Sequence, residues 1–158
     1  MLKRWSFSHG CSDLDAQKAS FASALRDIAS SKDLSHGHLL HSCILQSQLW
    51  QDGFLSNLLL QMYGKCDSLV DSLCLFSHMR HRDKFGWNFM IRALDEDGHS
   101  HESIMTFNHM LREGCLPDKH ILTSVISACA SEKDLVHGMQ IHAIAAPFGA
   151  ERDPAVGA

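Results

Sequence analysis

The sequence has few helix-breaking residues and no long apolar run. Only 3 of its 158 residues are proline. No continuous apolar stretch reaches the ~18 residues of a candidate membrane-spanning helix. The formal net charge is −4, so the chain also lacks the basic excess that strong non-specific nucleic-acid binding needs. We therefore expect no contact with a membrane, and the overall charge by itself favours no class of partner.

Motifs of the common enzyme classes are missing as well. The sequence contains no nucleophile elbow, no phosphate-binding glycine loop and no His-Glu-x-x-His helix. It also lacks the His-x-Glu and Pro-Cys-x-x-Cys motifs of zinc-dependent deaminases. The 6 cysteines include no Cys-x-x-Cys pair, which indicates reduced thiols in an intracellular compartment. We therefore predict a protein that is not an enzyme and that uses no cofactor or small-molecule substrate.

Residues 84–118 carry two short apolar stripes at helical spacing. The stripes consist of Trp87, Met90, Ile91 and Leu94, then of Ile104, Phe107, Met110 and Leu111. Residues 95–98 supply a turn between them, and Ser100 is the expected N-cap of the second helix. Gly114 and Pro117 are typical of a helix end. The pattern predicts a helical hairpin that needs neighbouring hairpins to cover its apolar faces, because helices this short are marginal alone in water.

The neighbouring hairpins are visible as repeats. A shift of 31 positions places Asn57 on Asn88 and Phe54 on Phe85, and it aligns residues 76–79 with 107–110. A shift of 101 positions aligns residues 30–37 with 131–138. Four segments then tile the chain without gaps, and each ends in aspartate: repeat 1 (18–52), repeat 2 (53–83), repeat 3 (84–118) and repeat 4 (119–153). Periods of this length predict an all-α solenoid of stacked helix-turn-helix hairpins.

The tiling resembles the pentatricopeptide repeat (PPR) family, in particular its plant PLS subclass, which combines P, L and shorter S motifs. Repeat 3 resembles a P motif because its start, FGWNFMI, and its Gly-x-x-Pro-Asp ending both fit. Repeat 2 resembles an S motif through the run NLLLQMYGKCDSL, and repeats 1 and 4 resemble L motifs. The order is therefore L-S-P-L, over about nine-tenths of the chain.

Apolar residues predict which side chains face inward in repeats 1 and 2. In repeat 1 they are Phe21, Leu25 and Ile28 on the first helix, and Leu40, Ile44 and Leu45 on the second helix, which opens at Asp33. In repeat 2 they are Leu58, Leu59 and Met62, then Leu69, Leu73 and Phe76. Tyr63 and Trp87 offer aromatic rings that bases could stack on, but at these positions core packing is the favoured interpretation.

A histidine cluster raises the question of a metal. His36, His38 and His41 share one predicted helix with Cys43. A zinc site needs ligands that converge in fixed geometry. Because two of the histidines recur at His137 and His142 as part of the repeated motif, we favour packing and predict no metal site.

Both ends of the chain depart from the repeat pattern. Residues 1–17 lie before the tiling and are expected to be either a short organellar transit signal or a disordered extension. Pro147 is expected to end the last helix of repeat 4. Residues 154–158 look like the start of an incomplete S motif, so we expect the chain to be truncated or a piece of a longer array.

The resemblance also implies which residues contact RNA. In this family the fifth and last residues of a motif read one base, and the second residue packs between bases. Carried over, the reading pairs are Asn57 with Asp83, Asn88 with Asp118 and Thr123 with Asp153, and the wedges are Phe54 and Phe85. Asn with Asp favours uridine in such proteins. Repeat 1 would pair Ala22 with Asp52, and alanine cannot hydrogen-bond a base.

The expected function is therefore sequence-specific binding of single-stranded RNA, as a non-catalytic specificity element in organellar RNA editing or processing, in the mitochondrion or the chloroplast. Editing-complex proteins are possible further partners. One alternative is a scaffold that docks such proteins, since a hairpin solenoid offers extended binding surfaces. Another is a truncated product without function.

Overall fold

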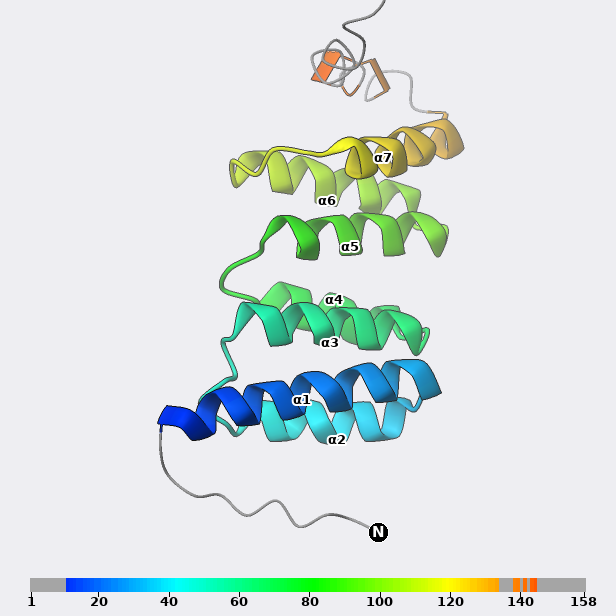
Figure 1. Ribbon diagram of the computed structural model, residues 1–158. Coiled ribbons are helices and arrows are strands. Elements are labelled where there is room, and N and C mark those ends of the chain that lie inside the picture. The colour runs from blue at the N-terminus through cyan, green and yellow to red at the C-terminus, as the bar shows by residue number, and fades with distance from the viewer. Residues whose placement is uncertain (1–10, 134–137, 140, 142, 145–158) are drawn as a thin grey trace, which may run out of the picture. The chain divides into compact units, whose positions relative to one another are not determined.

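A computed structural model describes residues 11–133, 138, 139, 141, 143 and 144 of the chain, and within them all regular structure is helical (Figure 1). The helices are α1 (Cys11–Ser31), α2 (Leu34–Leu45), α3 (Gly53–Lys65), α4 (Leu69–His78), α5 (Lys84–Glu96), α6 (Ser100–Arg112) and α7 (Lys119–Glu132). The predicted all-α fold of helical hairpins is confirmed. Among the described residues, none of the helices has the length and apolar character needed to cross a bilayer.

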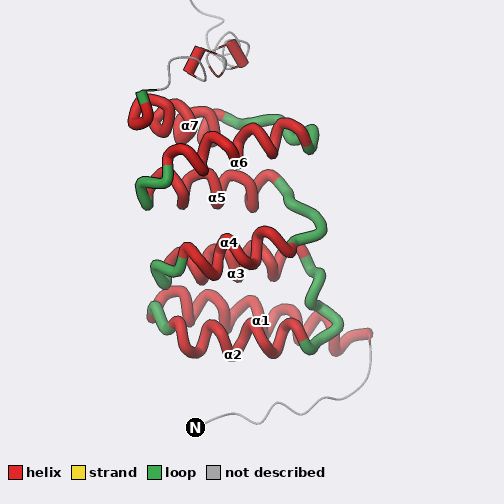
Figure 2. The backbone as a smooth tube through the Cα atoms, turned by 180° about the vertical axis from the view of Figure 1, so that it is seen from behind, coloured by secondary structure: helices red, strands yellow, loops and turns green. Residues whose placement is uncertain are grey.

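The helices form two compact units, Met1–Arg80 and His81–Ala158. In the first unit, α1 and α2 form one hairpin, α3 and α4 form the next, and α3 packs on both α1 and α2 (Figure 2). In the second unit, α5 and α6 form a hairpin, and α7 packs against both of its helices. The first helices of the hairpins run in the same direction within each unit, so their N-terminal ends lie on one side of that unit (Figure 1).

Aspartate fixes where the first helix of a hairpin begins. Asp52, Asp83 and Asp118 are the N-caps of α3, α5 and α7, and each side chain accepts a hydrogen bond from a backbone N–H of the first turn. This is the usual role of an aspartate N-cap. The helices therefore start at Gly53, Lys84 and Lys119, the first residues of repeats 2, 3 and 4.

A residue with positive φ closes each first helix. These residues are Lys32 (φ 55°), Asp67 (φ 57°), Gly98 (φ 82°) and Lys133 (φ 55°). The left-handed conformation ends the first helix and turns the chain toward the second helix of the hairpin. The spacing from Lys32 to Lys133 and from Asp67 to Gly98 repeats the two sequence shifts found above, so the backbone follows the same periodicity as the sequence.

The cores contain most of the side chains that the apolar pattern selects. Tyr63 and Trp87 are buried, which confirms core packing over a role as exposed platforms. Two expectations are wrong: Leu45 and Leu73 are exposed. Leu45 is the last residue of α2, where no neighbouring helix covers it, and Leu73 lies on the outer side of α4.

Helix boundaries also differ from the expectation in two places. The first helix starts at Cys11 and runs through Lys18, so the segment 11–17 is helical. The N-cap of α6 is His99, while Ser100 is the first helical residue and is buried, so the predicted Ser100 cap is off by one position. Residues 1–10, Pro147, Asp153 and 154–158 lie outside the described residues, as do most residues of the last predicted helix.

Candidate nucleic-acid interface

Two predicted RNA contacts, Phe85 and Asn88, lie in the first turns of α5. Phe85, the second residue of α5, has 72% of its surface exposed. Asn88, the fifth residue, is half-buried. The exposed phenyl ring offers a surface on which a base can stack. The half-buried amide offers a hydrogen-bond donor and an acceptor to the same ligand.

The first turns of α3 repeat this arrangement. Phe54 is 47% exposed, and Asn57 is half-buried. Phe54 differs from Phe85 in its surroundings, because the Lys18 Nζ lies 5.4 Å and the Arg26 Cζ 5.9 Å from the centre of its ring. Both distances are within the range of a cation–π interaction.

The predicted last-position aspartates have a structural task that the sequence interpretation missed. The Asp118 Oδ1 accepts from the His120 and Ile121 N–H groups at 2.9 and 3.0 Å. The Asp83 Oδ1 accepts from the Gly86 N–H at 2.9 Å. The signal was present, because an aspartate directly before an apolar helical stripe is a typical N-cap. In Asp118, one carboxylate oxygen is thus hydrogen-bonded to the helix, and a contact with a base would involve the other oxygen.

Asp52 has both of its carboxylate oxygens engaged. Its Oδ1 accepts from the Leu55 N–H at 3.0 Å, and the Lys18 Nζ donates to its Oδ2 at 2.7 Å. Partial burial alone would raise the pKa of Asp52, but the bonds from Lys18 and the Leu55 N–H outweigh it and lower the pKa. Ala22, its predicted partner, is buried. Repeat 1 therefore presents neither an amide nor an open carboxylate.

The third predicted pair is described only in part. Thr123 is exposed on α7, and its hydroxyl donates to the Lys119 carbonyl at 2.7 Å. The hydroxyl oxygen retains acceptor capacity toward a ligand. Asp153, its expected partner, lies outside the described residues.

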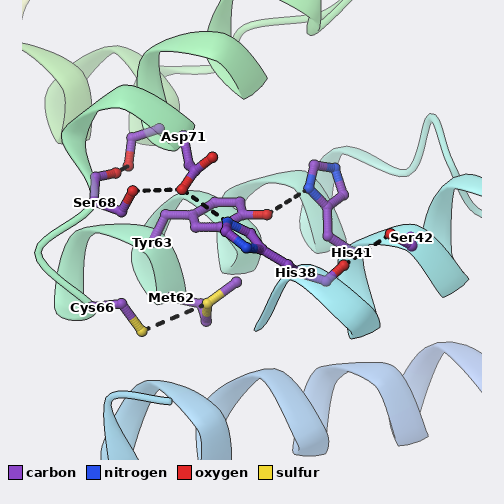
Figure 3. Close-up of polar contacts among 9 residues, drawn as sticks. His38, His41, Ser42, Met62, Tyr63, Cys66, Ser68 and Asp71 are labelled. Carbon is purple, nitrogen blue, oxygen red and sulfur yellow. Dashed lines mark hydrogen bonds and ion pairs between the residues drawn. The ribbon is translucent and has the colours of Figure 1, made fainter. Parts of the chain in front are cut away.

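The histidines considered as metal ligands have separate partners. Figure 3 shows two of them, with His38 beside Asp71 and His41 beside Tyr63. The His36 Nδ1 lies 2.6 Å from the Asp33 Oδ2, His38 reaches Asp71, and the His41 Nδ1 lies 2.8 Å from the Tyr63 hydroxyl. No three potential metal-binding side chains gather anywhere in the described part of the chain. His38 and His41 instead connect α2 to α4 and to α3, whereas His36 bonds the N-cap of its own helix.

Burial shifts the pKa values of both His41 and Tyr63. Burial lowers the pKa of His41 from its ordinary value of 6.5. Burial also raises the pKa of Tyr63 to about 12. Both groups are therefore held neutral near neutral pH, and the Tyr63 hydroxyl and the His41 Nδ1 share a hydrogen bond.

In the second unit, the two members of one predicted pair belong to the N-terminal parts of neighbouring helices. Asn88 lies near the start of α5, and Asp118 directly precedes α7. These two helices pack against each other with their N-terminal ends on the same side. An amide on one helix and a carboxylate at the head of the next form a polar edge that can hydrogen-bond a flat polar ring. Asn57 belongs to the first unit and Asp83 to the second, so their pairing stays a prediction.

Comparison with known proteins gives the same assignment as the repeats. Residues 85–115 match the family model described as PPR repeat. A mitochondrial pentatricopeptide repeat-containing protein of Arabidopsis thaliana is 33% identical over 142 residues, which are 90% of this chain. A second mitochondrial protein of this description is 32% identical over 92% of the chain. A further pentatricopeptide repeat-containing protein of Arabidopsis thaliana, whose name gives no organelle, is 38% identical over 78% of the chain.

The chain is much shorter than these relatives. It spans 18%, 16% and 22% of their respective lengths. The matches agree with the repeated intervals of the sequence. The chain therefore carries a pentatricopeptide repeat at residues 85–115, and along most of its length it is similar to pentatricopeptide repeat-containing proteins of Arabidopsis thaliana.

Proposed function

We propose that the chain binds single-stranded RNA and reads individual bases through Asn88 with Asp118 and Asn57 with Asp83. The observation that carries this proposal is the position of Asn88 and Asp118 at the heads of two packed parallel helices. Reading one base per helical repeat is a known mode of RNA recognition. Thr123 with Asp153 forms a third, weaker pair.

The chemistry of the pair suits uridine. The Asn88 amide offers a donor and an acceptor, which match the O4 or O2 carbonyl and the N3–H of the uracil edge. The Asp118 Oδ1 is engaged by the α7 N-cap, so the Oδ2 is the oxygen that contacts the base or a bridging water. Phe54 and Phe85 stack on neighbouring bases, which is worth about 1–3 kcal/mol per base.

The proposed role is that of a specificity element in organellar transcript editing or processing. Two relatives are named as mitochondrial proteins, which supports an organelle as the site of action. The sequence carries no deaminase motif, so in editing this chain would supply the address on the RNA, and other proteins would supply the chemistry. The PLS subclass is part of this proposal and rests on the L-S-P-L order.

A binding titration tests base reading. The chain is titrated with a 12-nucleotide single-stranded RNA that contains adjacent uridines, and with the same RNA in which adenines replace them. We expect tighter binding of the uridine form, and loss of that preference in the Asn57→Ala plus Asn88→Ala variant. Equal affinity of the parent chain for both RNAs would contradict the proposal. Asn108→Ala on α6 is the matched control, because Asn108 is also a half-buried helical asparagine.

A protein-docking scaffold is the second candidate, and the outer helices of the first unit favour it. Leu39 on α2 and Val70 on α4 are 64% and 78% exposed. These two helices contain no lysine, arginine or glutamate. Such a surface suits protein contact better than contact with a polyanion. Recovery of the same protein partners after nuclease treatment, without RNA crosslinking, would favour this candidate.

A further inference from the structure

The cationic side chains of the first unit are unevenly placed. Within its described residues, 11–80, lysine and arginine occur at Lys18, Arg26, Lys32, Lys65 and Arg80. Lys18 and Arg26 lie over the ring of Phe54, and the Arg80 Cζ lies 5.8 Å from the centre of the Trp50 ring. Three of these five cations therefore contact an aromatic ring, although the net charge of the whole chain is negative.

The two rings belong to one short segment. Trp50 lies in the loop before α3, and Phe54 is the second residue of α3, so the N-cap Asp52 lies between them. Four residues of chain separate their Cα atoms by at most about 14 Å. Trp50 is 51% exposed, similar to Phe54. Each ring thus contacts a cation and still presents a large part of its surface to solvent.

The two arginines near these rings, Arg26 and Arg80, have no carboxylate partner among the described residues. Lys18 is neutralised by Asp52 at 2.7 Å, and Lys32 is paired with Asp67 at 3.1 Å. No ion pair of Arg26 or Arg80 is found in the described part of the chain. Sites for single-stranded nucleic acid combine positive charges with exposed aromatic rings. Here two positive charges without a carboxylate partner lie next to two exposed aromatic rings.

We propose that Arg26, Trp50, Phe54 and Arg80 form such a site, the arginine–aromatic patch, and that it holds single-stranded RNA without regard to base identity. The guanidinium groups bind backbone phosphates, and the rings stack on bases. A guanidinium can cover one face of a ring while a base covers the other. The inference rests on the proposed RNA-binding function and adds an anchor in repeat 1, whose own Ala22–Asp52 pair cannot read a base.

Trp50 is the new residue in this site. The family resemblance places a stacking role on Phe54 and none on Trp50. Single-stranded RNA is the ligand that fits, because the bases of a duplex are already stacked on each other and cannot reach exposed rings. Every base has a flat face, so stacking on Trp50 and Phe54 adds affinity but no sequence preference.

A salt series tests the phosphate contacts. Affinity for a 12-nucleotide oligouridylate is measured at 50–200 mM salt for the parent chain, Arg26→Gln and Arg80→Gln. For a single strand, each lost phosphate contact should flatten the slope of log K against log salt by about 0.7. The control is Lys65→Gln, which removes the same charge from the exposed far end of α3 and should leave the slope unchanged.

The tryptophan tests the stacking contact. Trp87 is buried, whereas Trp50 is half-exposed, so in a Trp5→Phe background the quenching of tryptophan fluorescence by added oligouridylate should disappear in Trp50→Leu. The same variant should lose roughly fivefold or more in affinity, for oligouridylate and oligoadenylate alike. Leu116→Ala is the matched control, because Leu116 is exposed and precedes Asp118 by the same interval as Trp50 precedes Asp52.

The outcomes separate the patch from base reading. If the parent chain binds RNA with a uridine preference, and the Arg26, Arg80 and Trp50 variants bind like it at every salt concentration, the patch is refuted while base reading stands. If these variants weaken all RNAs equally, the patch is supported whatever the result for Asn88. If the parent chain binds no single-stranded RNA, both proposals fail.

Discussion

At the scale of single residues, burial decides the chemistry of His41. The ring is enclosed by Tyr63, which bonds its Nδ1, and by His38 and Asp71, which act on its charge. Desolvation is the largest effect and disfavours the protonated ring. A histidine that the sequence suggested as a metal ligand is therefore a neutral ring that links α2 to α3 through a hydrogen bond with Tyr63.

This burial makes stability depend on pH. The folded chain holds the proton of His41 more weakly than the unfolded chain, whose histidine titrates near 6.5. As pH falls below 6.5, the unfolded state takes up the proton first, so the contribution of neutral His41 is present above pH 6.5 and is lost as pH falls through the lowered pKa.

Urea unfolding at pH 5 to 8 measures this dependence of the free energy of unfolding on pH. The free energy of unfolding of the parent chain should fall below pH 6.5 more steeply than that of His41→Gln, which has no titrating ring there. His101→Gln, at an exposed position on α6, is the control and should follow the parent curve. Parallel curves for the parent chain and His41→Gln would contradict the assignment.

Gly37 shows how closely two helices of the first unit approach. A Cβ at this position of α2 would lie 2.6 Å from the Sδ and 2.9 Å from the Cε of Met62, which is fully buried on α3. Glycine is therefore required here by the neighbouring helix and not by a turn.

We expect Gly37→Ala to lower the free energy of unfolding by about 1 kcal/mol. Overpacking a core costs about 1–3 kcal/mol, while alanine regains about 1 kcal/mol of helix propensity over glycine. Gly53→Ala is the control, because a Cβ there meets nothing within 4 Å, and it should be neutral or stabilising. Both are measured by urea unfolding, and equal effects of the two substitutions would refute the close approach.

At the scale of the helix, the repeated aspartates combine two tasks that single substitutions can separate. Asp118 caps α7 through its Oδ1, and its Oδ2 is the proposed base contact. Asparagine is as good an N-cap as aspartate, whereas alanine cannot cap. Asn keeps the capping oxygen but replaces the second oxygen with a donor.

The prediction compares Asp118→Ala with Asp118→Asn. Alanine should lower the free energy of unfolding by about 0.5–2 kcal/mol, and asparagine should leave it nearly unchanged. Both should change the preference between uridine and adenine RNA. Thermal unfolding and the RNA titration measure the two effects independently. A stable Asn variant with unaltered preference would leave Asp118 with capping alone.

At the scale of the whole molecule, the net charge limits how RNA is held. With a formal net charge of −4, the chain has no basic surface excess, so its affinity depends on a few local contacts. The arginine–aromatic patch supplies two phosphate contacts, and base reading and stacking supply the rest.

Salt dependence should accordingly be shallow. Two phosphate contacts predict that affinity for single-stranded RNA falls only about sevenfold between 50 and 200 mM salt, whereas six to ten contacts would cost about 10³–10⁵ on duplex DNA. Filter binding or fluorescence anisotropy across this range measures the slope. A loss of more than about a hundredfold would show that many more cations contact the RNA.

The sequence by itself determined the periodicity of the chain and the positions of its first helices. Helical spacing of apolar residues and aspartates before apolar stripes are local signals, because each acts through the backbone within one turn. The predicted N-cap of α6 was wrong by one position, because His99 takes the place expected for Ser100.

Only the tertiary structure decided which side chains of those helices are buried, paired or left in solvent. The contacts of Trp50 with Arg80, of Gly37 with Met62 and of His41 with Tyr63 all join residues that are far apart in the sequence. No local pattern encodes such contacts, because they arise when separate helices pack and exclude water from a shared surface. The repeat could therefore be predicted from the sequence, whereas the arginine–aromatic patch could be inferred only once α1, α3 and the end of α4 had been placed together.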